Sequence, residues 1–153
     1  MTVFALMDAW IAAAGRTDPW LSVGLDLMDG WQADPVAGQE HLAAVLSSLG
    51  SLRRAGPVAP DPVALAVWFH HARPARPARD GRPDLDASAA AAYEALSGLT
   101  DPALAGEVAR LVRVLGAPHP EPGDGAGTLL CAAHRAAMGP SHLAPVPPVP
   151  GAQ

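Results

Sequence analysis

The chain has 153 residues, half of them hydrophobic, which is typical of one soluble globular domain with a real core. Its formal net charge of −5 argues against attraction of the whole surface to nucleic acid or to anionic membranes. The single cysteine, Cys131, rules out an internal disulfide, and no apolar run reaches the ~18 residues of a membrane span. We therefore expect a cytoplasmic protein with no nucleic-acid or membrane partner.

The N-terminal quarter of the chain predicts two helices. Apolar residues recur at helical spacing over residues 3–14, and Gly15 ends the segment. Because this stretch lacks a basic start and contains Asp8, it is typical of a helix and not of a signal peptide. Asp18 is then the expected N-cap and Pro19 the first residue of a second helix. The apolar face predicted for this second helix contains Leu21, Leu25 and Met28.

The next two predicted helices each begin at an Asp-Pro pair. Asp34-Pro35 is the expected start of the third helix. Its apolar stripe contains Leu42, Val45, Leu46, Leu49 and Leu52. Asp61-Pro62 opens the fourth helix, which is apolar on nearly every side over residues 63–69. A helix without a polar face should lie in the centre of the fold.

The remaining chain predicts three more helices, over residues 84–99, 100–116 and 126–139. Recurrent prolines exclude regular helix from 73–83, and the proline-rich segment 140–153 is expected to be a disordered or extended tail. No strand-like alternation is present. The sequence therefore predicts an all-α bundle of about seven helices in one domain, residues 1–139.

Two conspicuous features are better explained by structure than by catalysis. The segment GDGAG at 123–127 resembles a phosphate loop, but it lacks a preceding strand and a lysine, so we expect Asp124 to cap a helix. Cys131 follows two leucines inside an apolar helix. A nucleophilic thiol needs an activating base and some exposure, so a buried and inert thiol is the expectation.

The proline-containing segment after the fourth helix is strongly basic. Its arginines are Arg73, Arg76, Arg79 and Arg82. One interpretation is a solvated loop in a chain that has no lysine. The other is a lid that contacts a small anionic molecule, since arginine suits bidentate contact with phosphate or carboxylate. Arg73 and Arg76 are the candidate anion-binding residues.

Four histidines are the candidate metal ligands. His70 and His71 end the fourth helix, where adjacent side chains point ~100° apart and could converge on one ion only at a helix end. His41 precedes the stripe of the third helix, and His134 lies in the last helix. Each histidine taken alone is typical of a helix end or of a partly buried side chain.

Several motifs, taken in order, change that interpretation: GQEHLAAVL, ALAVWFHHA, DLDASAAAA, EVARLVRVLG and GDGAGTLLCAAHRAAMG. This series, over residues 31–139, resembles the HD-domain superfamily, and in particular small bacterial proteins described as predicted metal-dependent HD phosphohydrolases. That family holds one divalent-metal site with the pattern H…HD…D. The matching positions here are His41, His70, His71 and His134. Both family aspartates are therefore histidine in this chain, and the position of a family proton donor is Ala37.

The resemblance leaves two functions open. Loss of two carboxylates and of the proton donor implies that standard phosphohydrolase activity is lost. In the first interpretation, an all-histidine site binds one transition-metal ion, Zn, Fe, Ni or Cu, because imidazole suits these metals better than Mg or Mn. Such a protein would bind metal or act as a repurposed, hydrolase-like enzyme on a small anionic ligand. In the second, the protein is a metal-free pseudoenzyme that binds a ligand or another protein.

Overall fold

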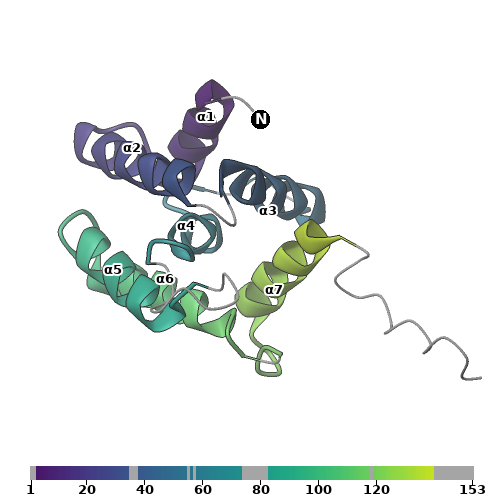
Figure 1. Ribbon diagram of the computed structural model, residues 1–153. Helices are drawn as coiled ribbons and strands as arrows, with labels where there is room; N and C mark the ends of the chain where they lie inside the picture. Colours follow the sequence, from purple (N-terminus) through teal and green to yellow (C-terminus); the bar gives the residue numbers. More distant parts are fainter. Residues whose placement is uncertain are drawn as a thin grey trace, which may run out of the picture.

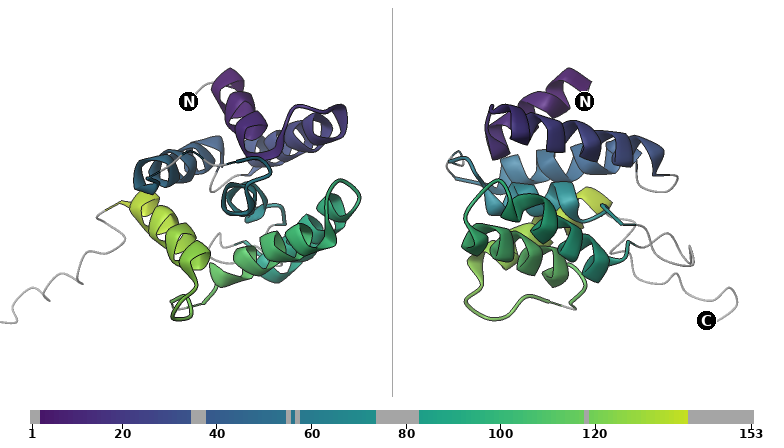
Figure 2. Two further views of the ribbon diagram at one scale, coloured as in Figure 1. Left: turned by 180° about the vertical axis from the view of Figure 1, so that it is seen from behind. Right: turned by 90° about the vertical axis from the view of Figure 1, so that its left-hand side faces the viewer.

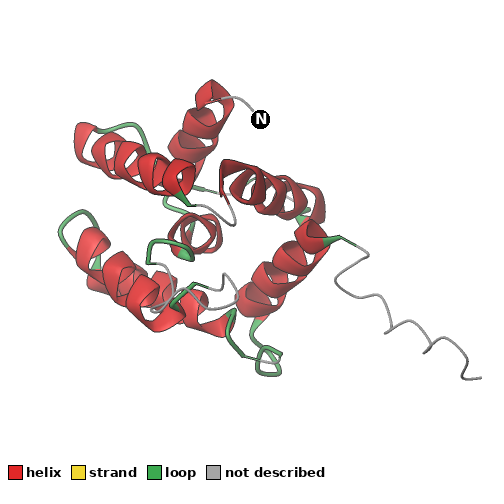
Figure 3. Ribbon diagram, in the orientation of Figure 1, coloured by secondary structure: helices red, strands yellow, loops and turns green. Residues whose placement is uncertain are grey.

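The computed structural model describes residues 3–34, 38–54, 56, 58–73, 83–117 and 119–139. These residues contain seven helices and no strand (Figure 3), which confirms the predicted all-α fold. The helices are α1 Val3–Ala14, α2 Asp18–Ala33, α3 Gly38–Leu52, α4 Pro62–Phe69, α5 Leu85–Ser97, α6 Pro102–Val114 and α7 Gly125–Met138. The predicted tail at 140–153 lies outside the described residues, so the boundary at residue 139 stays a prediction.

The short helix α4 lies at the centre of the bundle. Figures 1 and 2 show the other helices arranged around it, and α4 contacts α1, α3, α5, α6 and α7. Every residue from 63 to 69 is buried, as the continuous apolar run predicts. Around this centre, α5 packs along α6 and α3 packs along α7. No described helix is both long enough and apolar enough to cross a bilayer.

A buried ion pair fixes the start of α4. The Asp61 carboxylate accepts a hydrogen bond from the Val63 N–H and so caps the helix, as predicted. Arg53, just beyond α3, donates two hydrogen bonds to the same carboxylate. The Asp61 N–H donates to the Ala13 carbonyl oxygen at 2.7 Å. One residue thus joins the ends of α1 and α3 to the central helix.

Two of the predicted helix starts were wrong. Helix α2 begins at Asp18, so its N-cap is Thr17, whose side chain makes no capping hydrogen bond. Asp34 does not start α3: it is the C-cap of α2, and α3 begins at Gly38. The Asp34 side chain instead forms a hydrogen bond with His71.

Two leucines expected on buried faces are exposed. Leu25 is 53% exposed and Leu52 is 47% exposed. The buried face of α2 contains Trp20, Gly24, Met28 and Trp31. Leu25 is exposed because α1 and α2 approach closely at Gly24, where a Cβ would lie 2.5 Å from the Trp10 indole. This contact turns α2 so that Gly24 faces the core and Leu25 faces away from it.

Candidate metal centre

Three elements that are distant in sequence bring the four predicted histidines together. His41 lies in the first turns of α3, His70 is the C-cap of α4 and His71 follows it, and His134 lies on α7. His70 is 1% exposed, and the other three are partly buried. Because α4 ends at Phe69, the next two side chains, those of His70 and His71, can both turn toward His41 of α3. Adjacent residues within a helix point ~100° apart, and this constraint does not apply beyond the helix end.

The spacing of the donor nitrogens suits a metal ion. Candidate ligand atoms of His41, His70 and His71 all lie within 4.8 Å of one another. The Nε2 atoms of His41 and His70 are 3.2 Å apart. Two nitrogens bound to one tetrahedral zinc lie ~3.3 Å apart, because each is ~2.0–2.1 Å from the ion. These three side chains could therefore hold a metal after only small ring movements.

His134 lies against the same cluster. Its ring centroid is 5.2 Å from that of His41 and 5.4 Å from that of His70, and both pairs are nearly perpendicular. His70 and His71 are the closest pair, with centroids 4.5 Å apart. The structure thus brings together all four histidines that the sequence singles out, although only His41, His70 and His71 meet the donor spacing above.

Hydrogen bonds orient two of the rings. The Nδ1 atom of His70 faces the carbonyl oxygen of Val67, which can only accept, so His70 donates from Nδ1. The unprotonated Nε2 of His70 is then available toward His41. The Nδ1 atom of His71 lies 3.1 Å from Oδ2 of Asp34. A carboxylate that accepts from the distal nitrogen of a histidine is a common support for metal ligands.

Asp34 is the residue of this site that sequence reasoning missed. Its Asp-Pro context is typical of a helix start, which explains the wrong assignment. It is partly buried, with 14% of its side chain exposed, and it is the C-cap of α2, the fourth element at the site. No local pattern could indicate its pairing with His71, because 37 residues separate the two.

Burial keeps the imidazoles of His41, His70 and His71 neutral. It lowers the pKa of His41 to about 4, helped by the nearby His134 and His71 and opposed by Asp34. Burial first, and then His71, holds the pKa of His70 well below its usual range. Burial also lowers the pKa of His71, although its bond to Asp34 works in the other direction. Neutral imidazole is the form that ligates metals, so His41, His70 and His71 need no proton removed at neutral pH.

Trp31 forms an aromatic wall beside the histidines. Its ring centroid lies 5.2 Å from that of His70 and 4.8 Å from that of His71. The indole N–H donates to the Trp68 carbonyl oxygen at 2.9 Å, so the ring is fixed in place. An apolar wall lowers the local dielectric and strengthens any ion–ligand interaction beside it.

The other predicted candidates have structural roles or lie outside the described residues. Asp124 accepts from the Gly127 N–H and pairs with Arg110, so GDGAG is a capped helix start as expected. Cys131 is partly buried, and burial raises the pKa of its thiol, which disfavours the reactive thiolate. Arg76 and Ala37 are outside the described residues. Arg73 is exposed and follows the histidine pair directly.

Comparison with known proteins adds no assignment: no family model, curated protein or solved structure matches this chain.

Proposed function

We propose that this protein binds one divalent transition-metal ion through four imidazoles, those of His41, His70, His71 and His134. The observation that carries the proposal is the 3.2 Å separation of two inward-facing Nε2 atoms within a cluster of neutral histidines. Without an ion, the same separation corresponds to a hydrogen bond between the imidazoles of His41 and His70. With an ion, each imidazole would supply a lone pair.

The donor set selects the class of metal. Nitrogen-only ligation suits Zn, Fe, Ni or Cu, whereas Mg and Mn prefer the carboxylates that this cluster lacks. The nearby carboxylate of Asp34 bonds His71 on its outer nitrogen, so it adds negative charge without ligating. The residues present therefore fit a transition metal and do not fit magnesium.

The resemblance to the HD-domain superfamily supports the same proposal. The four histidines stand at the positions that match the ligand pattern H…HD…D, so we propose a divergent member of that superfamily with both aspartates replaced. Replacement of both by another ligand type favours an altered site over a lost one. Four protein ligands would close a tetrahedral site, which favours metal binding over hydrolysis. If His134 stays off the ion, three histidines leave the open position of a catalytic site.

The test is metal titration of untagged protein that has been stripped with a chelator. We expect one Co²⁺ or Zn²⁺ per chain by calorimetry, and a tetrahedral Co²⁺ absorption spectrum. His41→Ala and His70→Ala should each weaken binding at least ~100-fold, because each removes a ligand. The matched control is His119→Ala, since His119 is exposed.

Two results would overturn the proposal. One is the absence of stoichiometric binding by the native chain, which would favour the metal-free module. The other is equal affinity of His41→Ala, His70→Ala and His119→Ala, with circular dichroism showing all three folded. His134→Ala then separates the two coordination modes: unchanged affinity assigns three ligands, and weakened affinity assigns four.

A further inference from the structure

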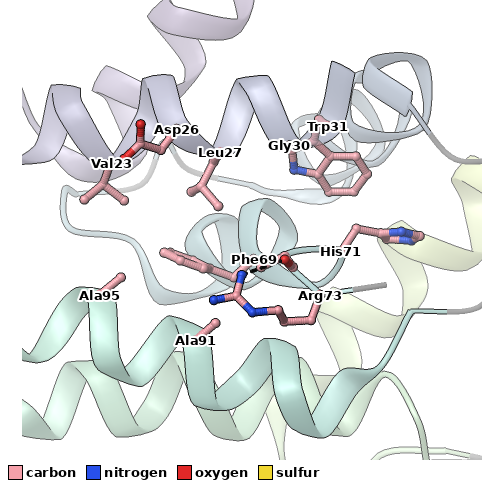
Figure 4. A pocket seen from close by; sticks show the side chains of 11 residues that line it. Val23, Asp26, Leu27, Gly30, Trp31, Phe69, His71, Arg73, Ala91 and Ala95 are labelled. Carbon is pink, nitrogen blue, oxygen red and sulfur yellow. Dashed lines mark hydrogen bonds between the residues drawn. The ribbon is translucent and has the colours of Figure 1, made fainter. Parts of the chain in front are cut away.

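A pocket of about 350 Å³ lies between α2 and α5, beside the histidine cluster (Figure 4). Trp31 and His71 line the pocket and also belong to the metal centre. Its volume falls at the lower end of the ~300–1,000 Å³ range of small-molecule sites. A ligand in this pocket would therefore be small and would lie next to the proposed metal.

Part of the pocket wall is made of apolar side chains. Val23 and Leu27 of α2 face Ala91 and Ala95 of α5, and Phe69 at the end of α4 lies between them (Figure 4). Small alanine side chains on α5 leave the space open. These walls fit the hydrocarbon part of a ligand.

Among the described residues that line this pocket, Arg73 is the one arginine. Figure 4 shows the guanidinium group of Arg73 reaching between Phe69 and Ala91. Its Nη1 donates to the carbonyl oxygen of Ala72 at 3.0 Å, and within the part of the chain that the structure describes no carboxylate lies within ion-pair distance of it. Among the described residues, the Ala72 carbonyl oxygen is the one hydrogen-bond acceptor of this guanidinium group, which leaves N–H donors for a ligand.

The backbone of Arg73 is held in place from α5. The fully buried hydroxyl of Ser88 accepts from the Arg73 N–H at 2.9 Å and donates to the Arg73 carbonyl oxygen at 3.3 Å. The same carbonyl oxygen accepts from the Asp84 N–H at 3.0 Å. Three hydrogen bonds therefore fix the point from which the arginine side chain enters the pocket, which reduces the entropy cost of binding.

We infer that this pocket binds a small organic monocarboxylate, with its carboxylate on Arg73 and its apolar body between α2 and α5. Arginine forms two parallel hydrogen bonds with a carboxylate. One guanidinium balances one negative charge, whereas a doubly charged phosphate would leave charge uncompensated beside apolar walls. Asp26, which lines the α2 side of the pocket, also disfavours a second negative charge. The position beside the metal rests on the proposed function, but the pocket itself does not.

The test uses phenylacetate as the probe on the full-length, metal-free protein, followed by calorimetry or ligand-observed NMR. We expect saturable one-to-one binding, and at least ~10-fold weaker binding of phenylacetamide, which has the same shape but no charge. Phenyl phosphate should bind more weakly than phenylacetate. Arg73→Gln should weaken phenylacetate binding at least ~10-fold, whereas Arg16→Gln, at an exposed arginine elsewhere, should not change it.

A second variant tests the location without removing charge. A Cβ at Gly30 meets no atom within 4 Å, and Gly30 lines the pocket, so Gly30→Leu should fill it and abolish binding. The inference is overturned by absent saturation, by equal binding of phenylacetamide, by stronger binding of phenyl phosphate, or by equal effects of Arg73→Gln and Arg16→Gln. Failure here with normal cobalt titration rejects only the pocket, and the reverse result rejects only the metal centre.

Discussion

The contact between Gly24 and Trp10 gives a sharp test of how the fold positions the site. Helix α2 carries Trp31 and ends at Ala33, just before Asp34, and its placement depends on this close approach. Gly24→Ala adds a Cβ that would lie 2.5 Å from Cδ1 and Nε1 of Trp10. Gly30→Ala makes the same change on the same helix, but its Cβ meets nothing within 4 Å. The two variants share a helix-propensity gain and differ only in packing.

The magnitudes follow from the surroundings of Trp10. Alanine in place of a helical glycine stabilises by roughly 0.5–1 kcal/mol where it fits, which is the expectation for Gly30→Ala. Trp10 has little room to retreat, because it is fully buried and packs edge-on against Trp68 at 5.2 Å. Its N–H also donates to the Trp20 carbonyl oxygen at 2.7 Å. Overpacking costs about 1–3 kcal/mol and a weakened buried hydrogen bond about 1 kcal/mol. The two variants should therefore differ by about 2–4 kcal/mol in free energy of unfolding.

Urea unfolding monitored by far-ultraviolet circular dichroism measures this difference, since tryptophan fluorescence would itself respond to a shift of Trp10. We expect a lower midpoint for Gly24→Ala than for the native chain and a slightly higher one for Gly30→Ala, with similar slopes. Equal midpoints for the two variants would refute the reasoning, because Trp10 would then have space to move at no cost.

Two further predictions concern the histidine cluster. First, the pKa of His41 is about 4 in the folded protein against 6.5 unfolded, so between these values the unfolded chain binds more protons. Metal-free protein should be most stable above pH 6.5 and lose stability as the pH falls toward 4. The full shift corresponds to roughly 3 kcal/mol, and partial solvation of the ring reduces the expected loss to about 1–2 kcal/mol. Urea midpoints at pH 7.5 and 5 in chelator measure this loss. His41→Gln should reduce the difference without abolishing it, because the pKa values of His70 and His71 are also lowered. A native chain equally stable at both pH values would contradict the prediction. Second, Asp34→Asn should lower Co²⁺ affinity about 10-fold, because the outer bond of His71 loses its charge. Asp29→Asn on the same helix is the control, and equal affinities of the two variants would show that Asp34 does not support the ligand.

The central helix was predictable from the sequence because its signals are local, and the clustering of the four histidines followed the predicted pattern. Asp61-Pro62 marks a helix start by its own chemistry, and an uninterrupted apolar run predicts burial without knowledge of any neighbour. Residue type alone did not select the four histidines among the six in the chain, and the resemblance to the pattern H…HD…D did. Membership of the HD-domain superfamily stays a prediction, because no comparison bears on it.

The parts that the sequence did not predict depend on tertiary contact. Leu25 and Gly24 are neighbours in the same amphipathic pattern, and only the Trp10 ring decides which of them faces the core. Asp34 has the local context of a cap, but its partner His71 lies on another element. The cavity beside Arg73 likewise arises from alanines on α5 that carry no individual signal.

The position of the histidines on α3, α4 and α7 has a consequence for stability. With one cysteine, this chain cannot form an internal disulfide. An ion shared by His41, His70 and His134 would act as a reversible cross-link between segments on both sides of the central helix. Because the unfolded chain lacks the assembled site, each tenfold rise in free metal above the dissociation constant would add about 1.4 kcal/mol to stability. Metal supply would then set how long the folded protein survives, even if the ion takes part in no reaction.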